Sequence, residues 1–503
     1  MTDLTDIEAD NVLLLEIYKV AVSELEEMGL PREKLEAQIR GKFTAEDLAR
    51  IDKLEWEEIK DAFDADNQER DVLEGITLAV KKLMRMYIFR TMNDTDEIYF
   101  YDEAQGIYVS GEKVISSTIA RKLGKFVTSH NVKEIIFRIR NLTYTDRKLF
   151  NTDIDKIVVK NGLLNLTTGE LLPHTSEFLC TMKLPLFYDP EARCPRITKF
   201  IEEVVEAGKR DAIYELFGYC LYRKYHINRA FMLHGEGNNG KSTLIELLQS
   251  FLGKDNCSTV ELQTLGTNRF SVARLYGKLA NLCADLPANP LRETGKFKML
   301  TGGDALEGEY KFKGGFSFTN YAKLIFSANR IPPVAYDDTD AFFRRWIIVN
   351  FPNQFPEDDP KTDKNLIIKL TTEEELSGML NLAIEGLKRL LANGEFTGSE
   401  SVKEMRDKYT RLSDTTAAFV LDFTAYDPEG LVGKKELYDA YCGYCRNNNY
   451  VPTTEKSFSM RLRQLSRVIS SRTMISGRQE YCWKGIMLLE EEADQDIQET
   501  LDR

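Results

Sequence analysis

The period of apolar and polar positions changes along the chain, and this change predicts a mixed α/β protein. Between residues 10 and 69 apolar side chains recur at helical spacing. Residues 98–101 and 106–109 are predicted as strands on either side of a polar turn, and residues 156–166 as a hairpin that turns at an Asn-Gly pair. Helical spacing returns from residue 197 to about residue 225.

The stretch from residue 230 to residue 252 combines a short apolar strand, a glycine-rich loop and an amphipathic helix that is predicted from Thr243. The loop has the spacing G-x4-G-K-S, in which glycines let backbone N–H groups turn toward phosphate oxygens. Lys241 would reach the outer phosphates, and Ser242 would offer its hydroxyl to Mg2+. We therefore expect ATP and Mg2+ as cofactors. The residues expected to contact the nucleotide are Gly235, Glu236, Gly237, Asn238, Asn239, Gly240, Lys241, Ser242 and Thr243.

Three apolar strands are predicted downstream, and each adjoins a polar residue of a type that ATPases use. Asp285 ends the first and could hold Mg2+ or polarise water, and Asn329 ends the second and could hold the attacking water. Arg344 and Arg345 precede the third and could stabilise transition-state charge in trans. Each residue alone fits a turn cap better, but their order after the glycine-rich loop favours catalysis.

Four segments together resemble the superfamily 3 helicases: residues 235–243, 298–304, 326–329 with Pro332, and 343–351. The resemblance is to the phage and plasmid primase-helicase family, which includes the poxvirus replication ATPase. Residues 159–164 and 184–195 resemble the domain that precedes the ATPase in that family. The resemblance runs from about residue 98 to residue 355 and covers little of residues 1–75.

The resemblance implies a P-loop AAA+-type core that forms a hexameric ring, hydrolyses ATP between subunits and moves 3′ to 5′ on one DNA strand. It makes Lys241 and Ser242 the ligands of phosphate and Mg2+, Asp285 the second acidic motif, and Asn329 the sensor amide. Arg345 matches the arginine finger, with Arg344 as the alternative.

The family's pore hairpin falls at Lys311, Phe312 and Lys313, which would contact DNA. One departure concerns the second acidic motif, where many relatives carry two adjacent acids and this chain has Asp285 alone. The catalytic base is therefore left open between Asp285, Glu236 and Asp304.

Charge is distributed unevenly along the 503 residues, which carry a formal net charge of −13. Residues 1–70 hold 20 Asp/Glu and 9 Lys/Arg, whereas residues 431–487 hold 10 Lys/Arg and 4 Asp/Glu. Local fields attract phosphates, so the acidic total does not exclude a nucleic-acid partner. No apolar run approaches the ~18 residues of a membrane span, and we expect a cytoplasmic protein without membrane contact.

The basic C-terminal region has the element pattern of a winged helix. Helices are predicted at 419–423, 434–446 and 457–465, and two strands are predicted at 474–475 and 481–489. Arg461, Arg463 and Arg467 would lie on or near the recognition helix and Arg478 at the wing tip, within reach of DNA phosphates. The alternative is a basic helical cap that only stabilises the ring.

These observations predict five segments and one main function. The segments are an acidic helical module (1–75), an α+β domain (76–195), the ATPase (196–395), the winged helix (400–490) and an acidic tail (491–503). The function is that of a replicative helicase of a virus or mobile element, acting on single-stranded and forked DNA, with a separate primase or polymerase as a further candidate partner. The alternative is an AAA+ ATPase that works as an origin-binding assembly switch or a protein remodeller.

Overall fold

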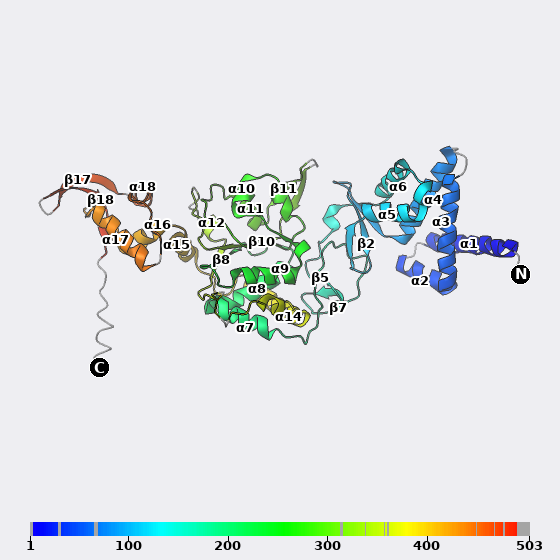
Figure 1. Ribbon diagram of the computed structural model, residues 1–503, viewed down its shortest axis with the longest axis horizontal. Coiled ribbons are helices and arrows are strands. Elements are labelled where there is room, and N and C mark those ends of the chain that lie inside the picture. Colours follow the sequence, from blue (N-terminus) through cyan, green and yellow to red (C-terminus); the bar gives the residue numbers. More distant parts are fainter. Residues whose placement is uncertain are drawn as a thin grey trace. The chain divides into compact units, whose positions relative to one another are not determined.

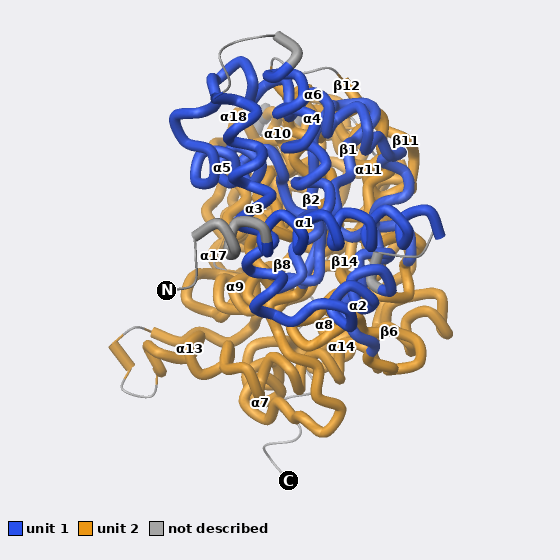
Figure 2. The backbone as a smooth tube through the Cα atoms, turned by 90° about the vertical axis from the view of Figure 1, so that its right-hand side faces the viewer, with its two compact units in different colours: residues 1–153, 172–183 blue, residues 154–171, 184–503 orange. Residues whose placement is uncertain are grey.

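The structure is a computed structural model that describes residues 4–28, 32–64, 69–311, 315–335, 337, 339–356, 358–359, 362–448, 450–466, 468–475 and 478–489. The chain divides into two units, residues 1–153 with 172–183 and residues 154–171 with 184–503 (Figure 2). Among the described residues, no helix is both long enough and apolar enough to cross a bilayer.

The first unit contains helices that share one apolar core and a small sheet. The helices are α1 (Leu4–Glu27), α2 (Arg32–Lys42), α3 (Ala45–Asp64), α4 (Glu69–Met86), α5 (Glu112–Leu123) and α6 (Ser129–Leu142). The strands are β1 (Phe89–Met92), β2 (Ile98–Asp102), β3 (Ile107–Ser110) and β4 (Tyr144–Thr145), in the order β3-β2-β1-β4. Strands β2 and β3 lie where strands are expected.

Helix α4 is the centre of this core because its apolar residues Ile76, Ala79, Val80 and Leu83 fall on one face. They pack against side chains of α3, α5 and α6. The boundary expected near residue 75 falls inside α4, so the core extends across it.

The second unit is built on a five-stranded sheet in which every pair of neighbouring strands is parallel. The strands are β8 (Ala230–His234), β9 (Cys257–Ser258), β10 (Ala280–Cys283), β13 (Lys323–Ala328) and β14 (Trp346–Asn350), in the order β14-β8-β13-β10-β9. Its helices are α7 (Pro195–Val204), α8 (Arg210–Leu221), α9 (Lys241–Leu252), α10 (Leu262–Thr267), α11 (Gly295–Gly302), α12 (Asp340–Phe343), α13 (Leu366–Leu370) and α14 (Glu373–Asn393).

Helices cover both faces of this sheet, with α8 and α14 on one side and α10 and α11 on the other (Figure 1). All six residues of β13 are buried, as expected for a strand with both faces covered. A separate hairpin joins β11 (Ala305–Glu309) to β12 (Gly315–Thr319), and three short strands form a sheet before α7: β5 (Lys156–Val159), β6 (Gly162–Asn165) and β7 (Leu171–Leu172).

The C-terminal elements form a small core of their own around Phe419, Tyr441, Phe458 and Trp483. The helices are α15 (Val402–Ser413), α16 (Thr415–Phe423), α17 (Lys434–Asn447) and α18 (Glu455–Leu465). The strands are β15 (Thr424–Ala425), β16 (Leu431–Gly433), β17 (Ile469–Ile475), β18 (Arg478–Lys484) and β19 (Met487–Leu488), of which β16, β18 and β17 form one sheet.

Candidate functional site

The candidate site lies at the carboxyl edge of the parallel sheet, where the loop after β8 leads into α9. Strand β8 lies between β14 and β13, so the loop that follows β8 lies between the carboxyl ends of these two strands. Helix α9 begins at Lys241, two residues before the expected start, and Gly240 in left-handed conformation (φ 88°) precedes it. This is the edge at which ligands bind in open parallel sheets.

Steric limits require glycine at two positions of this loop. A Cβ on Gly240 would lie 2.8 Å from Cγ1 of Val204 in α7, and the φ of 88° is rare for other residues. A Cβ on Gly235 would lie 2.1 Å from Nδ2 of Asn239 and 2.8 Å from the backbone oxygen of Phe351. The loop is therefore closely fitted to its neighbours and not an open turn.

The ammonium group of Lys241 lies inside the loop. Its Nζ donates to the backbone oxygens of Gly235 (2.7 Å) and Glu236 (2.8 Å) and to Oδ1 of Asn239 (2.9 Å). The side chain is only 5% exposed. Burial lowers the pKa of Lys241, and the negative charge of Asp285 opposes this effect.

The segment after β14 braces the loop from one side. The backbone N–H of Phe355 donates to the oxygen of Asn238 (2.6 Å), Nε2 of Gln354 donates to the Glu236 carboxylate (2.9 Å), and Nδ2 of Asn239 donates to the oxygen of Phe351 (3.4 Å). Sequence reasoning missed this brace. The available signal was the third apolar strand predicted after the loop, whose parallel pairing with β8 brings its end to the loop.

A second contact joins the end of β8 to β14 and to Glu206, which follows α7. His234 Nδ1 lies 3.3 Å from Oδ1 of Asn350, whose backbone and side-chain N–H groups donate to the carboxylate of Glu206. Burial lowers the pKa of His234. The neutral ring therefore predominates at neutral pH and leaves Lys241 as the positive side chain in the loop.

Asp285 and Asn329 follow β10 and β13, which are the next two strands on one side of β8. Asn329 comes directly after β13, the neighbour of β8, and Asp285 comes two residues after β10. The N–H of Leu286 donates to the oxygen of Ser327 (2.8 Å), which fixes the two strand ends together. Both side chains are exposed, as is Ser242 at the start of α9. The fold thus places Lys241, Ser242, Asp285 and Asn329 at one edge.

The two arginines lie at the opposite edge, directly before β14. Arg345 is 7% exposed, and its guanidinium donates to Oγ1 of Thr301 (2.8 Å), to the oxygen of Lys298 (3.2 Å) and to the oxygen of Ala341. Arg344 is exposed. Neither side chain is at the edge that carries the loop, and only Arg344 presents its guanidinium to the surface. Asp304 is exposed and its charge acts on Arg345, so it belongs to this second edge.

The DNA-binding residues expected from the sequence lie on separate elements. Lys311 is exposed beside the tip of the β11–β12 hairpin, whereas Phe312 and Lys313 lie outside the described residues. In α18, Nε of Arg461 lies 2.5 Å from the carboxylate of Asp414, and the guanidinium of Arg463 lies 5.2 Å from the ring centroid of Trp483. Arg467 and the side chain of Arg478, and likewise the acidic tail at 491–503, lie outside the part that is described.

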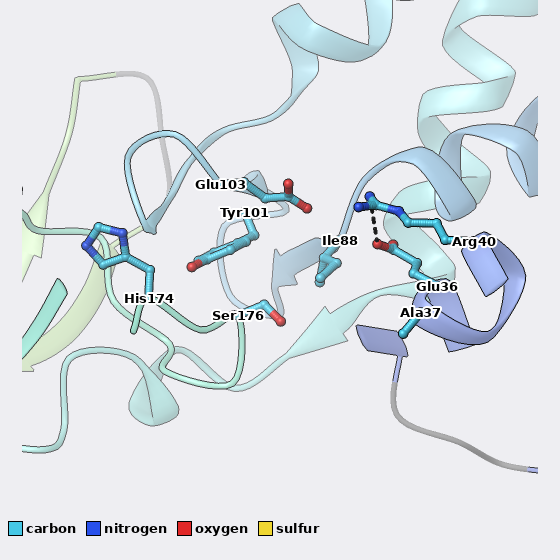
Figure 3. A pocket seen from close by; sticks show the side chains of 8 residues that line it. All are labelled: Glu36, Ala37, Arg40, Ile88, Tyr101, Glu103, His174 and Ser176. Atoms are coloured by element: carbon cyan, nitrogen blue, oxygen red, sulfur yellow. Dashed lines mark ion pairs between the residues drawn. The ribbon is translucent and has the colours of Figure 1, made fainter. Parts of the chain in front are cut away.

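A cavity of about 420 Å3 lies in the first unit (Figure 3). Its lining residues are Glu36, Ala37, Arg40, Ile88, Tyr101, Glu103, His174 and Ser176. Arg40 pairs with Glu36 at 4.0 Å on one side, and Tyr101 and His174 lie on the other. None of the site residues expected from the sequence lines this cavity, and its chemistry gives no reason to move the candidate site there.

The chain is a mixed α/β protein with a glycine-rich loop at the carboxyl edge of a parallel sheet. Comparisons with known proteins find two family models that match parts of it and a viral relative. Residues 47–206 match the family model described as D5 N terminal like, and residues 233–345 match a family of unknown function, DUF5906. Over 271 residues the chain is 26% identical to the candidate helicase L207/L206 of Acanthamoeba polyphaga mimivirus. That match covers 48% of this chain and 28% of the mimivirus protein, so the chain spans well under two thirds of that relative.

Comparison with solved structures gives matches of low sequence identity and low TM-score. The A form apo structure of the NrS-1 C-terminal region is 12% identical, with a TM-score of 0.46 over 81% of this chain and 98% of that chain. A structure of JCV helicase is 14% identical, with a TM-score of 0.23 over 43% of this chain and 64% of that chain.

Proposed function

We propose that the chain is an ATP-driven DNA helicase of a virus or mobile element, of the superfamily 3 AAA+ type. The observation that carries the proposal is the enclosed Lys241 ammonium at the carboxyl edge of the parallel sheet, with Asp285 and Asn329 on the next strand ends. The mimivirus relative is named as a helicase, and this name supports a nucleic acid as the substrate. Hexameric assembly and 3′ to 5′ movement are part of the same proposal and rest on the resemblance of the motifs.

The residues of the loop fit a nucleotide triphosphate with Mg2+. Lys241 satisfies its ammonium with loop oxygens, which are acceptors that phosphate oxygens can replace. The N-terminus of the 12-residue helix α9 adds positive potential at the same place. Mg2+ supplies charge neutralisation on the phosphates, and Ser242 and Asp285 provide the oxygen ligands that it prefers. Gly235, Glu236, Gly237, Asn238, Asn239, Gly240 and Thr243 complete the expected contacts.

For the arginine finger, burial favours Arg344 over Arg345. The Arg345 guanidinium already makes three hydrogen bonds inside its own chain, and withdrawing it would break all three, including the buried one to Thr301. Arg344 is exposed at the edge opposite its own loop. An arginine in this position can reach a nucleotide only on another subunit, which is the geometry of a finger that acts in trans.

DNA would be held by two parts of the second unit. The β11–β12 hairpin, with Lys311, Phe312 and Lys313 at its tip, would line the pore. The C-terminal elements from α16 to β19 would form the winged helix that binds beside the ring, through Arg463 and the wing. Arg461 is tied to Asp414, so we assign it a structural part in this domain.

One pair of measurements tests this proposal against its alternatives. ATP hydrolysis is measured with and without single-stranded DNA, and strand displacement is measured on forked duplexes with a 3′ or a 5′ tail. The proposal predicts DNA-stimulated hydrolysis and displacement from the 3′ tail. Hydrolysis with assembly on duplex DNA but no displacement would identify an origin-binding switch, and hydrolysis that responds only to a protein substrate would identify a remodeller.

A further inference from the structure

The C-terminal domain carries a surface cluster of cations around one exposed aromatic ring. We name it the Tyr481 patch, and it consists of Lys434, Arg463, Arg472 and Tyr481 above the buried Trp483. Strands β17 and β18 pair so that Arg472 faces Tyr481 and Ser470 faces Trp483 on the same side of the sheet. Lys434, the first residue of α17, reaches this side and donates to Oγ of Ser470 at 2.6 Å.

Distances between these groups show that the cations lie on the rings. The Arg472 guanidinium lies 5.3 Å from the centroid of Tyr481, and Nζ of Lys434 lies 5.5 Å from the same ring. Lys434 and Arg463 lie 4.5 Å and 5.2 Å from the centroid of Trp483. Three positive groups therefore meet within one small surface.

These positive groups have no neutralising partner in the described part of the chain. Among the described side chains, none of the three cations forms an ion pair with a carboxylate, in contrast to Arg461, which pairs with Asp414. The Nε1 group of Trp483 is likewise buried without an acceptor among the described residues. A cluster rich in donors and poor in acceptors attracts an anion with several oxygens, such as a phosphate diester.

The exposed ring of Tyr481 indicates which nucleic acid fits. Tyr481 is 60% exposed, whereas Trp483 is fully covered. An aromatic face flanked by cations is the combination that binds single strands, because unpaired bases stack on the ring while the cations neutralise phosphates. Paired bases in a duplex do not offer a free face to the ring. The ligand class is therefore single-stranded DNA.

We infer that the Tyr481 patch binds single-stranded DNA by stacking a base on Tyr481 and pairing phosphates with Lys434, Arg463 and Arg472. This inference rests on the proposed DNA-directed function and assigns a grip on the unpaired strand to the C-terminal domain. The residues expected from the sequence in this domain were arginines alone. Tyr481 adds a stacking surface that arginines spaced along a recognition helix lack. Lys434 and Arg472 add positive charges beside it.

Affinity for a fluorescein-labelled oligo-dT of about 12 nucleotides tests the inference on the full chain without nucleotide. We expect Tyr481→Ala to weaken binding about 10- to 100-fold and Tyr481→Phe to retain it, since only the stacking face matters. Tyr426→Ala is the matched control, because Tyr426 is 66% exposed in the same domain but outside the patch. Duplex DNA of the same length should bind the Tyr481→Ala variant as it binds wild type.

Salt dependence tests the cations separately. The double change Lys434→Gln with Arg472→Gln should lower the slope of log affinity against log salt by about 1.4, at about 0.7 per phosphate contact on a single strand. Lys388→Gln, an exposed lysine of α14, removes a charge outside the patch and should leave the slope unchanged. An unchanged slope in the double variant would overturn the phosphate contacts.

Photo-cross-linking gives a readout that pore binding cannot imitate. An oligonucleotide with 5-iododeoxyuridine should cross-link to the peptide that contains Tyr481, and the Tyr426→Ala variant should keep this product. Unchanged oligo-dT affinity in Tyr481→Ala, or cross-links on other peptides only, would overturn the inference. Failure of the wild type to hydrolyse ATP or displace strands, with the cross-link at Tyr481 present, would instead overturn only the proposed function.

Discussion

Replacing Lys241 with alanine separates the chemistry of the candidate site from its structure. The ammonium makes three hydrogen bonds of 2.7 to 2.9 Å to the loop. A hydrogen bond to a charged group contributes about 1.5–3 kcal/mol, but the cost of burying the ammonium, seen in its lowered pKa, offsets much of this sum. We therefore expect Lys241→Ala to lower the free energy of unfolding by only about 1–2 kcal/mol.

The effect on turnover should be far larger than this loss of stability. One fixed donor to transition-state charge is worth about 10²- to 10³-fold in rate, and a full positive charge beside the outer phosphates should be worth at least as much. Phosphate release at saturating ATP and Mg2+ should therefore fall by about 10²-fold or more. The melting temperature should fall by only about 2–8 °C, as expected for a domain of this size.

Lys254→Ala is the matched control for this experiment. Lys254 is an exposed lysine just beyond the other end of α9, and its loss removes the same charge without touching the loop. We expect wild-type turnover and stability in that variant. Turnover of Lys241→Ala within tenfold of wild type, in protein that melts cooperatively, would refute the assignment of the loop to a nucleotide.

Three further predictions concern the strand ends and the buried lysine of β13. Asp285→Asn should keep ATP affinity but lose phosphate release, as measured by equilibrium binding and single-turnover assays; retained turnover would reduce Asp285 to a cap. The Arg344→Ala variant should lose ATP hydrolysis, and mixing it with the Lys241→Ala variant should restore part of the activity. The Arg345→Ala variant should chiefly have a lower melting temperature. The reverse pattern would restore Arg345 as the arginine finger. Burial lowers the pKa of Lys323 to about 7 in the folded protein. Between about pH 7 and pH 10 the Lys323 amine is therefore protonated in the unfolded chain but not in the folded one. The free energy of unfolding then rises with pH, by up to ~1.4 kcal/mol per pH unit. Lys323→Met should remove this rise in denaturant unfolding at pH 7.5 and 9.5, and equal slopes in both proteins would contradict it.

The sequence predicts the local part of the candidate site because the signals there are local. A strand, a G-x4-G-K-S loop and a helix are adjacent in the chain, and the structure has β8 and α9 at these residues within two positions. Asp285 and Asn329 were singled out by their order after the loop, and in the structure they follow parallel strands, whose ends meet at one edge. Nothing local distinguishes Arg344 from Arg345, because which of two neighbours turns inward depends on Thr301 and Lys298, about 45 residues away in sequence.

The donors of the brace could not be identified from the sequence, for a similar reason. Its donors, Gln354 and the backbone of Phe355, lie more than 110 residues after the loop and carry no recognisable motif. The Tyr481 patch also depends on register: Arg472 and Lys434 meet Tyr481 only because β17 and β18 pair as they do and α17 starts beside them. A shift by one residue would turn the ring to the other face of the sheet.

Strand β14 connects the two edges of the proposed motor. Its amino end carries Arg344, and its carboxyl end carries Asn350 and the segment that braces the loop. The first four of its five residues are buried and the strand spans roughly 16 Å, so the two ends are fixed relative to each other. If Arg344 contacts the nucleotide of a neighbouring subunit, the force on that contact reaches the loop of its own subunit through one rigid strand. Hydrolysis at successive sites of a ring would then be coupled by β14. The change Gln354→Ala removes the hydrogen bond from Gln354 to Glu236. It should lower the cooperativity with which the hydrolysis rate depends on ATP concentration, while leaving the Arg344 contact in place. Unchanged cooperativity in that variant would show that the coupling takes another path.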